Sequence, residues 1–574
     1  TITANFKLAQ ELDMITKGLK FTGLFSFKNY SSSSTERSAS YNHYYMSSYD
    51  PSSMEYKITR IGDEQSTALT NDGSRNGDRK MYFQAILDYN RIFKEVHDLN
   101  IMFLYNQEQY DINGPTTLFS SLPQRKQGVA GRVSYSYDGR YYIEGNFGYN
   151  GSENFAKGHR FGFFPSIAVG YNISNEKFWQ PIKPVISNLK IRGSWGLVGN
   201  DATNAGRFAY MEDLVLGGSD SYTTGIRQDT YYSGPSWNRY FNPDLTWEVG
   251  EKINLGLDLQ LFNDFNLTFD IFREKRRDIF MTRENSIPEI VGTGETKITS
   301  NNGEMENKGL DLAIDYNKQI TKDFFLSFKS TLTFARNKVL KMDEPPYFEY
   351  PGLSDVGHPL GTYWGYVADG LFPDQETIDN SPRQDLGYTP QPGDIKYVNQ
   401  PNAKGEYDNV INSNDRVAIG HPYDPELVYG FGPSMKWKNW DFSFFFQGVA
   451  RTSFMMYGMH PFGTTSIKNM LQFVADDHWS VDNPNPNAAY PRLTKDSNGN
   501  NDQYSTYWLR NAAFLKLKNA EIGYTYKGMR FYLSGVNLLT FSPFKHWDPE
   551  MGGGNGLYYP TQRVFNIGFQ MTIQ

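Results

Sequence analysis

Two short stretches place a histidine beside carboxylates, residue types that could support acid–base or metal chemistry. They are "ADDHW" at 475–479 and "KHWD" at 545–548. A metal or proton-transfer site needs a further group converging on the same point, and neither stretch supplies one nearby. The chain has no H-E-x-x-H, G-x-S-x-G or phosphate-loop pattern, and it has no cysteine. We therefore interpret His478 and His546 as polar loop residues, and we expect no catalytic site, no enzyme activity and no cofactor.

A second stretch that could bind a metal lies between 399 and 415, where oxygen-bearing residues are frequent. A calcium loop of the usual kind requires the run D-x-[DN]-x-[DN]-G, in which alternate side chains ligate the ion. That run is missing between Asp408 and Asp415. We therefore predict an ordinary polar loop and no metal site, and we interpret "GGG" at 552–554 as a flexible loop.

Aromatic residues in the polar stretches are better candidates for binding. A flat ring can stack on a sugar or pack against a peptide. The same rings could instead pack against a partner protein or keep a long loop compact, and the sequence leaves these roles open. The candidate substrate-contact residues are Tyr231, Tyr232, Trp237, Tyr240, Tyr363, Trp364 and Tyr366.

The segments that must position these residues alternate between apolar and polar with a period of two. Within 253–280, leucines from Leu255 to Leu261 alternate with polar or small residues such as Asp258, and the alternation resumes after Asn263 and Asp264. Successive side chains of a strand point to opposite faces, so this is a β-hairpin. The pattern recurs in about 17 strands, many of them longer than the ~5–6 residues usual in soluble sheets.

The connectors between these strands alternate in length. Short turns on one rim and long loops on the other are typical of a bacterial outer-membrane barrel, with turns in the periplasm and loops outside the cell. The expected short connectors are 14–17, 92–95, 138–140, 263–265, 318–323, 438–439 and 527–528, with a middling one at 174–188 that is expected to hold a helical turn. The expected long connectors are 200–245, 281–304, 338–426, 452–511 and 541–561.

Composition agrees with this fold. Aromatic residues make up 16% of the chain, and no stretch approaches the ~18 consecutive apolar residues of a spanning helix. A net charge of −7 argues against a nucleic-acid partner. Soluble propellers and sandwiches also contain alternating strands, but they have no reason to sort loop length by rim. We predict an all-β fold, a large antiparallel transmembrane β-barrel in the bacterial outer membrane.

Two further groups of residues fit a membrane setting. Strand-end aromatics are expected to form an interfacial girdle. The basic run "REKRR" at 273–277 could meet lipopolysaccharide phosphates, although a solvated rim is the simpler interpretation. The girdle candidates are Tyr141, Tyr142, Trp437 and Trp440.

Several stretches between 160 and 574 together resemble, in order and spacing, the barrel motifs of the SusC/RagA family of TonB-dependent transporters. They are "FGFFPSIAVGYNISNEKFW" (161–179), "LKIRGSWGLVGN" (189–200), "FNPDLTWEVGEKINLGLDLQLFNDFNLTFDIF" (241–272), "PGDIKY" (392–397), "NDRVAIGHPYDPELVYGFG" (414–432), "YWLRNAAFLKLKNAEIGYTY" (507–526), "YLSGVNLLTF" (532–541) and "WDPEM" (547–551).

The resemblance implies a barrel of ~22 strands with a plug in its lumen. It implies import of oligosaccharides or oligopeptides, powered by the TonB complex, with a SusD-like lipoprotein lid. No plug or TonB-contacting box is recognised in the chain, and an odd number of strands places residue 1 at the extracellular rim. We therefore expect residues 1–574 to be the C-terminal part of the barrel, with the plug and about five strands outside it.

Two alternatives to transport stay open. One is a barrel-anchored structural or adhesion protein that uses the same lipid-facing strands and its loops for attachment. The other is a soluble carbohydrate-binding β-protein. A plug domain encoded upstream favours transport over adhesion, and dependence on detergent separates both barrel proteins from the soluble alternative.

Overall fold

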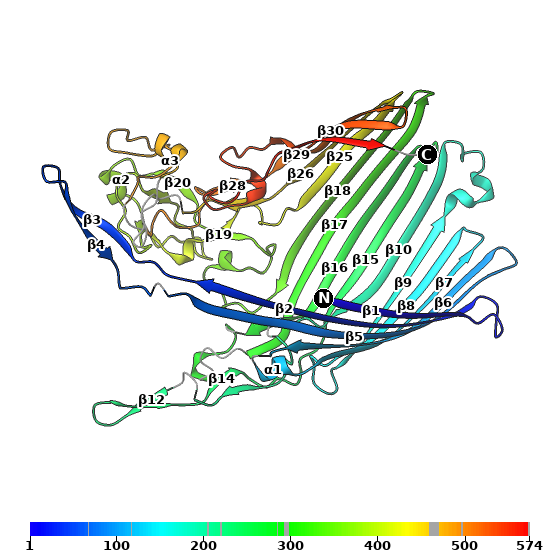
Figure 1. Ribbon diagram of the computed structural model, residues 1–574, viewed down its shortest axis with the longest axis horizontal. Coiled ribbons are helices and arrows are strands. Elements are labelled where there is room, and N and C mark those ends of the chain that lie inside the picture. The colour runs from blue at the N-terminus through cyan, green and yellow to red at the C-terminus, as the bar shows by residue number, and fades with distance from the viewer. Residues whose placement is uncertain are drawn as a thin grey trace.

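A single antiparallel sheet of 17 strands forms the wall of the molecule (Figure 1). The computed structural model describes residues 1–66, 68–115, 117–203, 206–217, 221–283, 285–291, 298–458, 470–494 and 498–571. Each wall strand pairs with the next one along the chain, and the sheet curls as a barrel wall does. The predicted all-β barrel fold and the strand count are confirmed. The wall strands are β1 (Ile2–Glu11), β2 (Leu19–Ser38), β5 (Thr70–Phe93), β6 (His97–Asn113), β7 (Gln124–Tyr137), β8 (Tyr141–Ser152), β9 (Phe161–Asn172), β10 (Ile186–Asn200), β15 (Glu248–Leu261), β16 (Phe265–Arg283), β17 (Ile298–Thr321), β18 (Phe324–Lys341), β25 (Leu427–Trp437), β26 (Trp440–Ala450), β29 (Phe514–Tyr526), β30 (Met529–Phe541) and β31 (Val564–Met571).

The remaining elements are short and lie in the connections. No helix in the described part of the chain has both the length and the apolar character needed to cross a bilayer. The strands are β3 (His43–Asp50), β4 (Glu55–Ile61), β11 (Asp213–Val215), β12 (Ser221–Thr224), β13 (Thr230–Ser233), β14 (Ser236–Arg239), β19 (Tyr363–Gly365), β20 (Ala368–Leu371), β21 (Arg383–Gln384), β22 (Ile395–Tyr397), β23 (Val410–Ile411), β24 (Val417–Ile419), β27 (Ser453–Met455) and β28 (Leu509–Asn511). The helices are α1 (Leu118–Ser121), α2 (Gln375–Asp379) and α3 (Gln472–Asp476), with single 3-10 turns at Ile173–Asn175, Lys177–Trp179, Glu289–Val291, Pro351–Leu353, Ser413–Asp415 and Pro549–Met551.

The predicted alternation of connector length is confirmed, with boundaries that shift by a few residues. The middling connector contains helical turns at Ile173–Asn175 and Lys177–Trp179, as expected. The short connections therefore gather at one rim and the longer ones at the other. The short connections are 12–18, 94–96, 138–140, 173–185, 262–264, 322–323, 438–439 and 527–528. The longer ones are 39–69, 114–123, 153–160, 201–247, 284–297, 342–426, 451–513 and 542–563.

Backbone conformation at the tight turns explains why the hairpins form where the sequence places them. Asp138 and Gly139 have φ of 52° and 60°, and Lys527 and Gly528 have φ of 47° and 80°. Two successive positive φ values define the mirror-image turn, whose twist matches that of the flanking strands. Glycine adopts this conformation without steric strain, so these two positions fix the register of their hairpins.

The two faces of the wall differ in chemistry, as the alternation predicts. On one face Leu257, Phe269, Leu312 and Leu332 lie in direct register across β15, β16, β17 and β18. Leu255, which points the same way, is 51% exposed. We call this side the apolar face and the opposite side, which carries the carboxylates of the same strands, the polar face.

An arginine bridges three strands on the polar face. The guanidinium of Arg192 on β10 donates to both carboxylate oxygens of Asp270 on β16, at 2.7 and 2.6 Å, and to Asp258 at 3.2 Å. Gly256 of β15 lies in register between Arg192 and Asp270. A Cβ atom at position 256 would lie 2.4 Å from Arg192 Cζ, so the bridge requires a residue without a side chain.

We expect Gly256→Ala to destabilise the wall by about 1–3 kcal/mol, because the new methyl group displaces the Arg192 guanidinium from Asp270. The matched control is Gly145→Ala on β8, where a Cβ meets no atom within 4 Å. The measurement is the temperature at which the heat-modifiable gel band of the purified protein converts. Equal midpoints for the two variants would show that the bridge does not depend on Gly256.

Candidate functional site

Three of the longer connections fold together into one unit at the long-loop rim (Figure 1). They are 342–426, 451–513 and 542–563, and we call their described residues the loop module. Side chains from all three connections share a buried core, so these segments are not independent loops. The core residues are Tyr366, Leu371, Ile395, Tyr397, Ile411, Ile419, Phe454, Met455, Met456, Val474, Trp479, Ala488, Tyr490, Trp508, Ala512 and Phe544.

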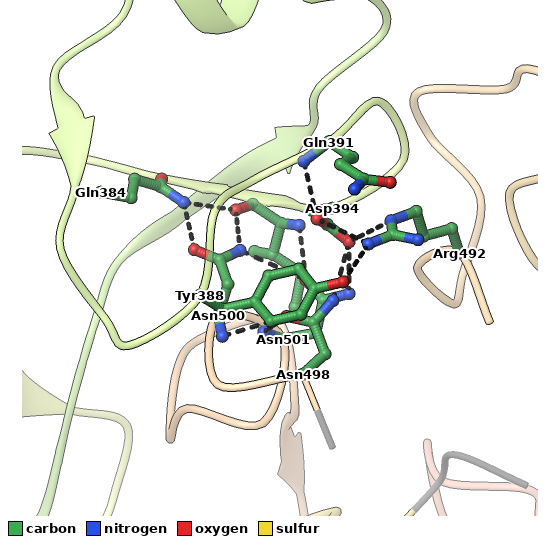
Figure 2. Close-up of polar contacts among 9 residues, drawn as sticks. Gln384, Tyr388, Gln391, Asp394, Arg492, Asn498, Asn500 and Asn501 are labelled. Atoms are coloured by element: carbon green, nitrogen blue, oxygen red, sulfur yellow. Dashed lines mark hydrogen bonds and ion pairs between the residues drawn. The ribbon is translucent and has the colours of Figure 1, made fainter. Parts of the chain in front are cut away.

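A fully buried carboxylate ties the first two connections together (Figure 2). Asp394, in "PGDIKY", is 0% exposed. Its Oδ1 accepts hydrogen bonds from Arg492 Nε at 2.7 Å, Asn498 Nδ2 at 3.0 Å and Asn501 Nδ2 at 2.9 Å. Its Oδ2 accepts from the Gln391 backbone N–H at 2.8 Å. We call Asp394, Arg492, Asn498 and Asn501 the Asp394 clasp.

Side-chain amides extend this network along β22. Gln384 donates from Nε2 to the Ile395 carbonyl at 3.0 Å, and its Oε1 accepts from the Tyr397 N–H at 2.7 Å. Asn500 donates to the same Ile395 carbonyl at 2.9 Å. Burial raises the pKa of Tyr397, so its hydroxyl stays protonated and donates to the Asn500 carbonyl at 2.7 Å. The amides therefore substitute for strand neighbours that β22 lacks on this side.

A cavity of about 210 Å³ lies beside the clasp. The clasp residues Asn498 and Asn501 form part of its wall, but their amide groups already donate to Asp394. Most of the remaining lining consists of rings and aliphatic groups, as in the pockets that bind small molecules, although this cavity is smaller than their usual ~300–1,000 Å³. Besides the clasp, the lining includes Met456, Tyr457, Val474, Tyr490, Leu493, Tyr504 and Trp508.

A buried lysine attaches the third connection to the wall. Lys516 of β29 is 0% exposed, and its ammonium contacts Asp548 at 2.6 Å and also Glu550. Both acids belong to "WDPEM" at 547–551. Because two carboxylates surround one ammonium group, the end of the loop module is anchored to β29 by charge as well as by packing.

The predicted substrate-contact residues of the loop module have different surroundings. Tyr366 is 3% exposed, and its ring packs against Tyr397 at 5.1 Å between ring centroids. Trp364 is half-buried and donates from Nε1 to Asp355 at 2.6 Å. Burial raises the pKa of the half-buried Tyr363 to about 12. Tyr366 therefore belongs to the core, while the other two rings retain some exposed surface.

The other predicted contact residues lie in connection 201–247, on the far side of the open end from β19 in Figure 1. Tyr231 and Tyr232 of β13 are 63% and 46% exposed. Trp237 and Tyr240 are half-buried and stack on one another, with ring centroids 5.4 Å apart. The structure thus does not bring the seven aromatic residues into one site. The base of this connection packs in a second small core of Phe155, Ala209, Leu245, Trp247 and Phe280.

The histidines and the 399–415 loop have structural surroundings. The Nδ1 atom of His478 lies 2.8 Å from the Ala475 carbonyl oxygen, and the His546 ring stacks on Phe473 with centroids 4.2 Å apart. Asp415 is 2% exposed, and its carboxylate accepts from two backbone N–H groups at 2.7 Å each. Burial, the largest influence, raises the pKa of Asp415 despite these hydrogen bonds. Among the described residues, no group of three or more His, Asp or Glu side chains could hold a metal ion.

A known family accounts for this wall. The family described as "TonB dependent receptor-like, beta-barrel" matches residues 3–538. The chain belongs to this family. As a TonB-dependent receptor barrel it is an outer-membrane protein, so its apolar face contacts lipid and its polar face lines the lumen. The long-loop rim, with the loop module, is extracellular.

Individual relatives of this TonB-dependent receptor barrel agree. It is 29% identical to TonB-dependent receptor SusC of Bacteroides thetaiotaomicron over 468 residues, which cover 77% of this chain and 43% of SusC. It is 27% identical to TonB-dependent receptor P3 of Formosa agariphila over 478 residues, covering 77% of this chain and 45% of P3. The chain spans about half the length of these curated relatives.

A solved structure shares the fold. The RagAB peptide transporter superposes with a TM-score of 0.72 at 19% identity, covering 99% of this chain and 61% of that chain. The expected SusC/RagA type is thereby confirmed for the barrel.

The membrane assignment tests the expected aromatic girdle at the short-turn rim. Trp437 and Trp440 face each other in register and are 52% and 39% exposed. Tyr141 is 46% exposed and stacks on Tyr171. The prediction for Tyr142 is wrong, because adjacent strand residues point to opposite faces and the Lys190 ammonium covers its ring at 4.3 Å. Tyr142 therefore faces the lumen.

Sequence reasoning missed the Asp394 clasp. "PGDIKY" was singled out only as a stretch of resemblance, and "NGNND" at 498–502 was treated as loop. An acidic residue beside apolar Ile395 and Tyr397 was the available signal that this carboxylate is buried and bonded.

Proposed function

We propose that this chain forms most of the barrel of a TonB-energised importer of oligosaccharides or oligopeptides, with a SusD-like surface lipoprotein as lid. The observation that carries the proposal is the family match over residues 3–538, supported by the similarity to SusC. The plug, about five further strands and the contact with TonB would be supplied by polypeptide outside residues 1–574. The RagAB relative is a peptide transporter, which supports keeping peptides as a cargo class beside glycans.

In this proposal the chain does no covalent chemistry. The polar face supplies a wetted lumen, and the loop module gives cargo a rigid entrance. Exposed rings of connection 201–247 would touch cargo, because flat rings suit both sugars and peptides. Tyr231, Tyr232, Trp237 and Tyr240 take this role, together with Tyr363 and Trp364 of the loop module. Tyr366 would act through the core that positions the last two.

The test is uptake of labelled oligosaccharides and oligopeptides by cells that carry the full-length protein as their sole receptor for that cargo. We expect uptake to require both the protein and the proton-motive force, and to fall about fivefold in Trp237→Ala/Tyr240→Ala, as loss of roughly 1 kcal/mol predicts. Surface display of the variant is the control. Uptake that persists without the protein would reject the proposal.

The adhesion alternative is favoured by one feature, the hairpin of β3 and β4, which reaches beyond the long-loop rim in Figure 1. One side of this hairpin carries Tyr44, Met46, Tyr49, Tyr56 and Ile58, which are 52% to 67% exposed. Exposed apolar patches of this kind mark interaction surfaces. Loss of cell attachment with unchanged uptake after deletion of the protein would favour adhesion over import.

A further inference from the structure

A run of cations continues the apolar face of β16. Side chains on that face alternate with those on the polar face, so every second residue belongs to it. Near the short-turn rim these residues are apolar, and towards the long-loop rim they become positively charged. From one rim to the other they are Phe265, Leu267, Phe269, Ile271, Arg273, Lys275 and Arg277.

The first of these cations is part of a row across three strands. Arg273 on β16 is in register with Lys308 on β17, and Lys308 is in register with Arg336 on β18. Adjacent strands lie ~4.8 Å apart, so the three residues span about 10 Å. Their side chains are 52%, 60% and 56% exposed. Three like charges in adjacent register destabilise a sheet unless anions compensate them.

The protein itself compensates this row only in part. Glu306 contacts Arg273 at 2.6 Å and Lys308 at 2.7 Å. Arg336 contacts the buried Glu426 at 3.1 Å, but Glu426 also contacts Arg451 at 2.7 Å. Two carboxylates therefore serve four cations, so the row carries excess positive charge.

The row borders the membrane. One step closer to the short-turn rim, the same face presents Ile271, Leu310 and Phe334 in register. In an outer-membrane barrel these side chains contact acyl chains. Long cationic side chains at the end of an apolar band extend toward the headgroups. The cations are local to this part of the wall, because on β8 and β9 the apolar face continues at the same rim with Tyr149 stacked on Phe161.

We propose that Arg273, Lys308 and Arg336 bind phosphate groups of a glycolipid of the outer leaflet, such as lipopolysaccharide. Guanidinium and ammonium groups form short, charge-assisted hydrogen bonds with phosphate oxygens. The acyl chains of the same molecule pack on Ile271, Leu310 and Phe334. The proposal rests on the outer-membrane location of the family and does not depend on transport or cargo.

The experiment uses the full-length protein extracted from its native membrane and exchanged into nanodiscs. Binding of phosphorylated lipid A is compared with binding of enzymatically dephosphorylated lipid A, with inorganic phosphate as competitor. The test variant is Arg273→Gln/Lys308→Gln/Arg336→Gln. The matched control, Lys57→Gln/Arg60→Gln/Arg227→Gln, removes three exposed cations of the long-loop rim that lie outside the row. Heat-modifiable migration establishes that each variant is folded.

We expect the test variant to bind phosphorylated lipid A about tenfold more weakly, and the wild type and the control to prefer it over the dephosphorylated form. Arg273→Lys/Arg336→Lys, which keeps the charges, should retain most of the binding. Unchanged binding by the test variant would overturn the proposal, as would an equal loss in the control. Displacement of the lipid by millimolar inorganic phosphate would assign the row to free phosphate and overturn the lipid site.

Discussion

Replacement of Asp394 by alanine is expected to unfold the loop module while the wall stays intact. The variant removes the only carboxylate of the Asp394 clasp and leaves the guanidinium of Arg492, whose side chain is 17% exposed, without its ion-pair partner. Removing one partner of a buried pair costs about 3–5 kcal/mol. The amides of Asn498 and Asn501 lose their acceptor as well. Hydrogen exchange followed by mass spectrometry should show loss of protection in 384–397 and 498–508 and unchanged protection in the wall.

The control for this variant is Asp385→Ala in the same connection. Asp385 pairs with Arg383 at 3.3 Å, but both side chains are largely exposed, so about 0–1 kcal/mol is expected. Protection of 384–397 in Asp394→Ala that equals the protection in Asp385→Ala would contradict the role assigned to the clasp.

Replacement of Lys516 by alanine is expected to release connection 542–563 from the wall. The carboxylates of Asp548 and Glu550 then face each other without their ammonium partner, which should cost about 3–5 kcal/mol. In the wild type, burial opposes the charged form of Asp548. Hydrogen bonds from Lys516, Thr561 and the Glu550 backbone outweigh burial and hold the pKa of Asp548 below its ordinary value. The measurement is the rate of proteolytic cleavage within 542–563 in detergent-solubilised protein.

Acid should reproduce part of this effect. Because the pKa of Asp548 is lower in the folded protein, its contribution to stability is present above the ordinary carboxyl pKa and is lost as pH falls through the lowered value. Cleavage of the wild type should therefore rise in strong acid, whereas Lys516→Ala should be cleaved rapidly at neutral pH. Lys518→Ala is the matched control, because Lys518 is 28% exposed and contacts only Glu550 of this pair, at 3.2 Å. A Lys516→Ala protein as resistant as Lys518→Ala would contradict the anchor.

The wall could be predicted from the sequence because its determinants are local. Alternation along 253–280 defines both faces of β15 and β16, and residues such as Asp138 and Gly139 define their turn without reference to distant parts of the chain. The positions of the rims follow from the connector lengths. Only strand ends were misplaced, since alternation fades where a strand leaves the bilayer and both of its faces meet water.

The loop module could not be predicted, because its determinants are contacts between distant residues. Asp394 accepts hydrogen bonds from residues 98 and 107 positions away, and no period in the sequence marks such a pair. Tyr366 and Tyr363 are similar in sequence context, yet one lies in the core and the other at its edge. Contact of the seven aromatic residues with cargo stays a prediction.

The connectivity of the wall has a consequence for biogenesis. Each of its ladders joins strands that follow one another in the chain, so every closure step fixes only a short segment, and the entropy lost per step grows slowly with segment length. The clasp instead closes loops of about a hundred residues, which folds slowly by comparison. We expect the hairpins to zip together in succession and the module to condense last, after its three connections have crossed the bilayer, so that a late intermediate has an inserted wall and an unstructured crown.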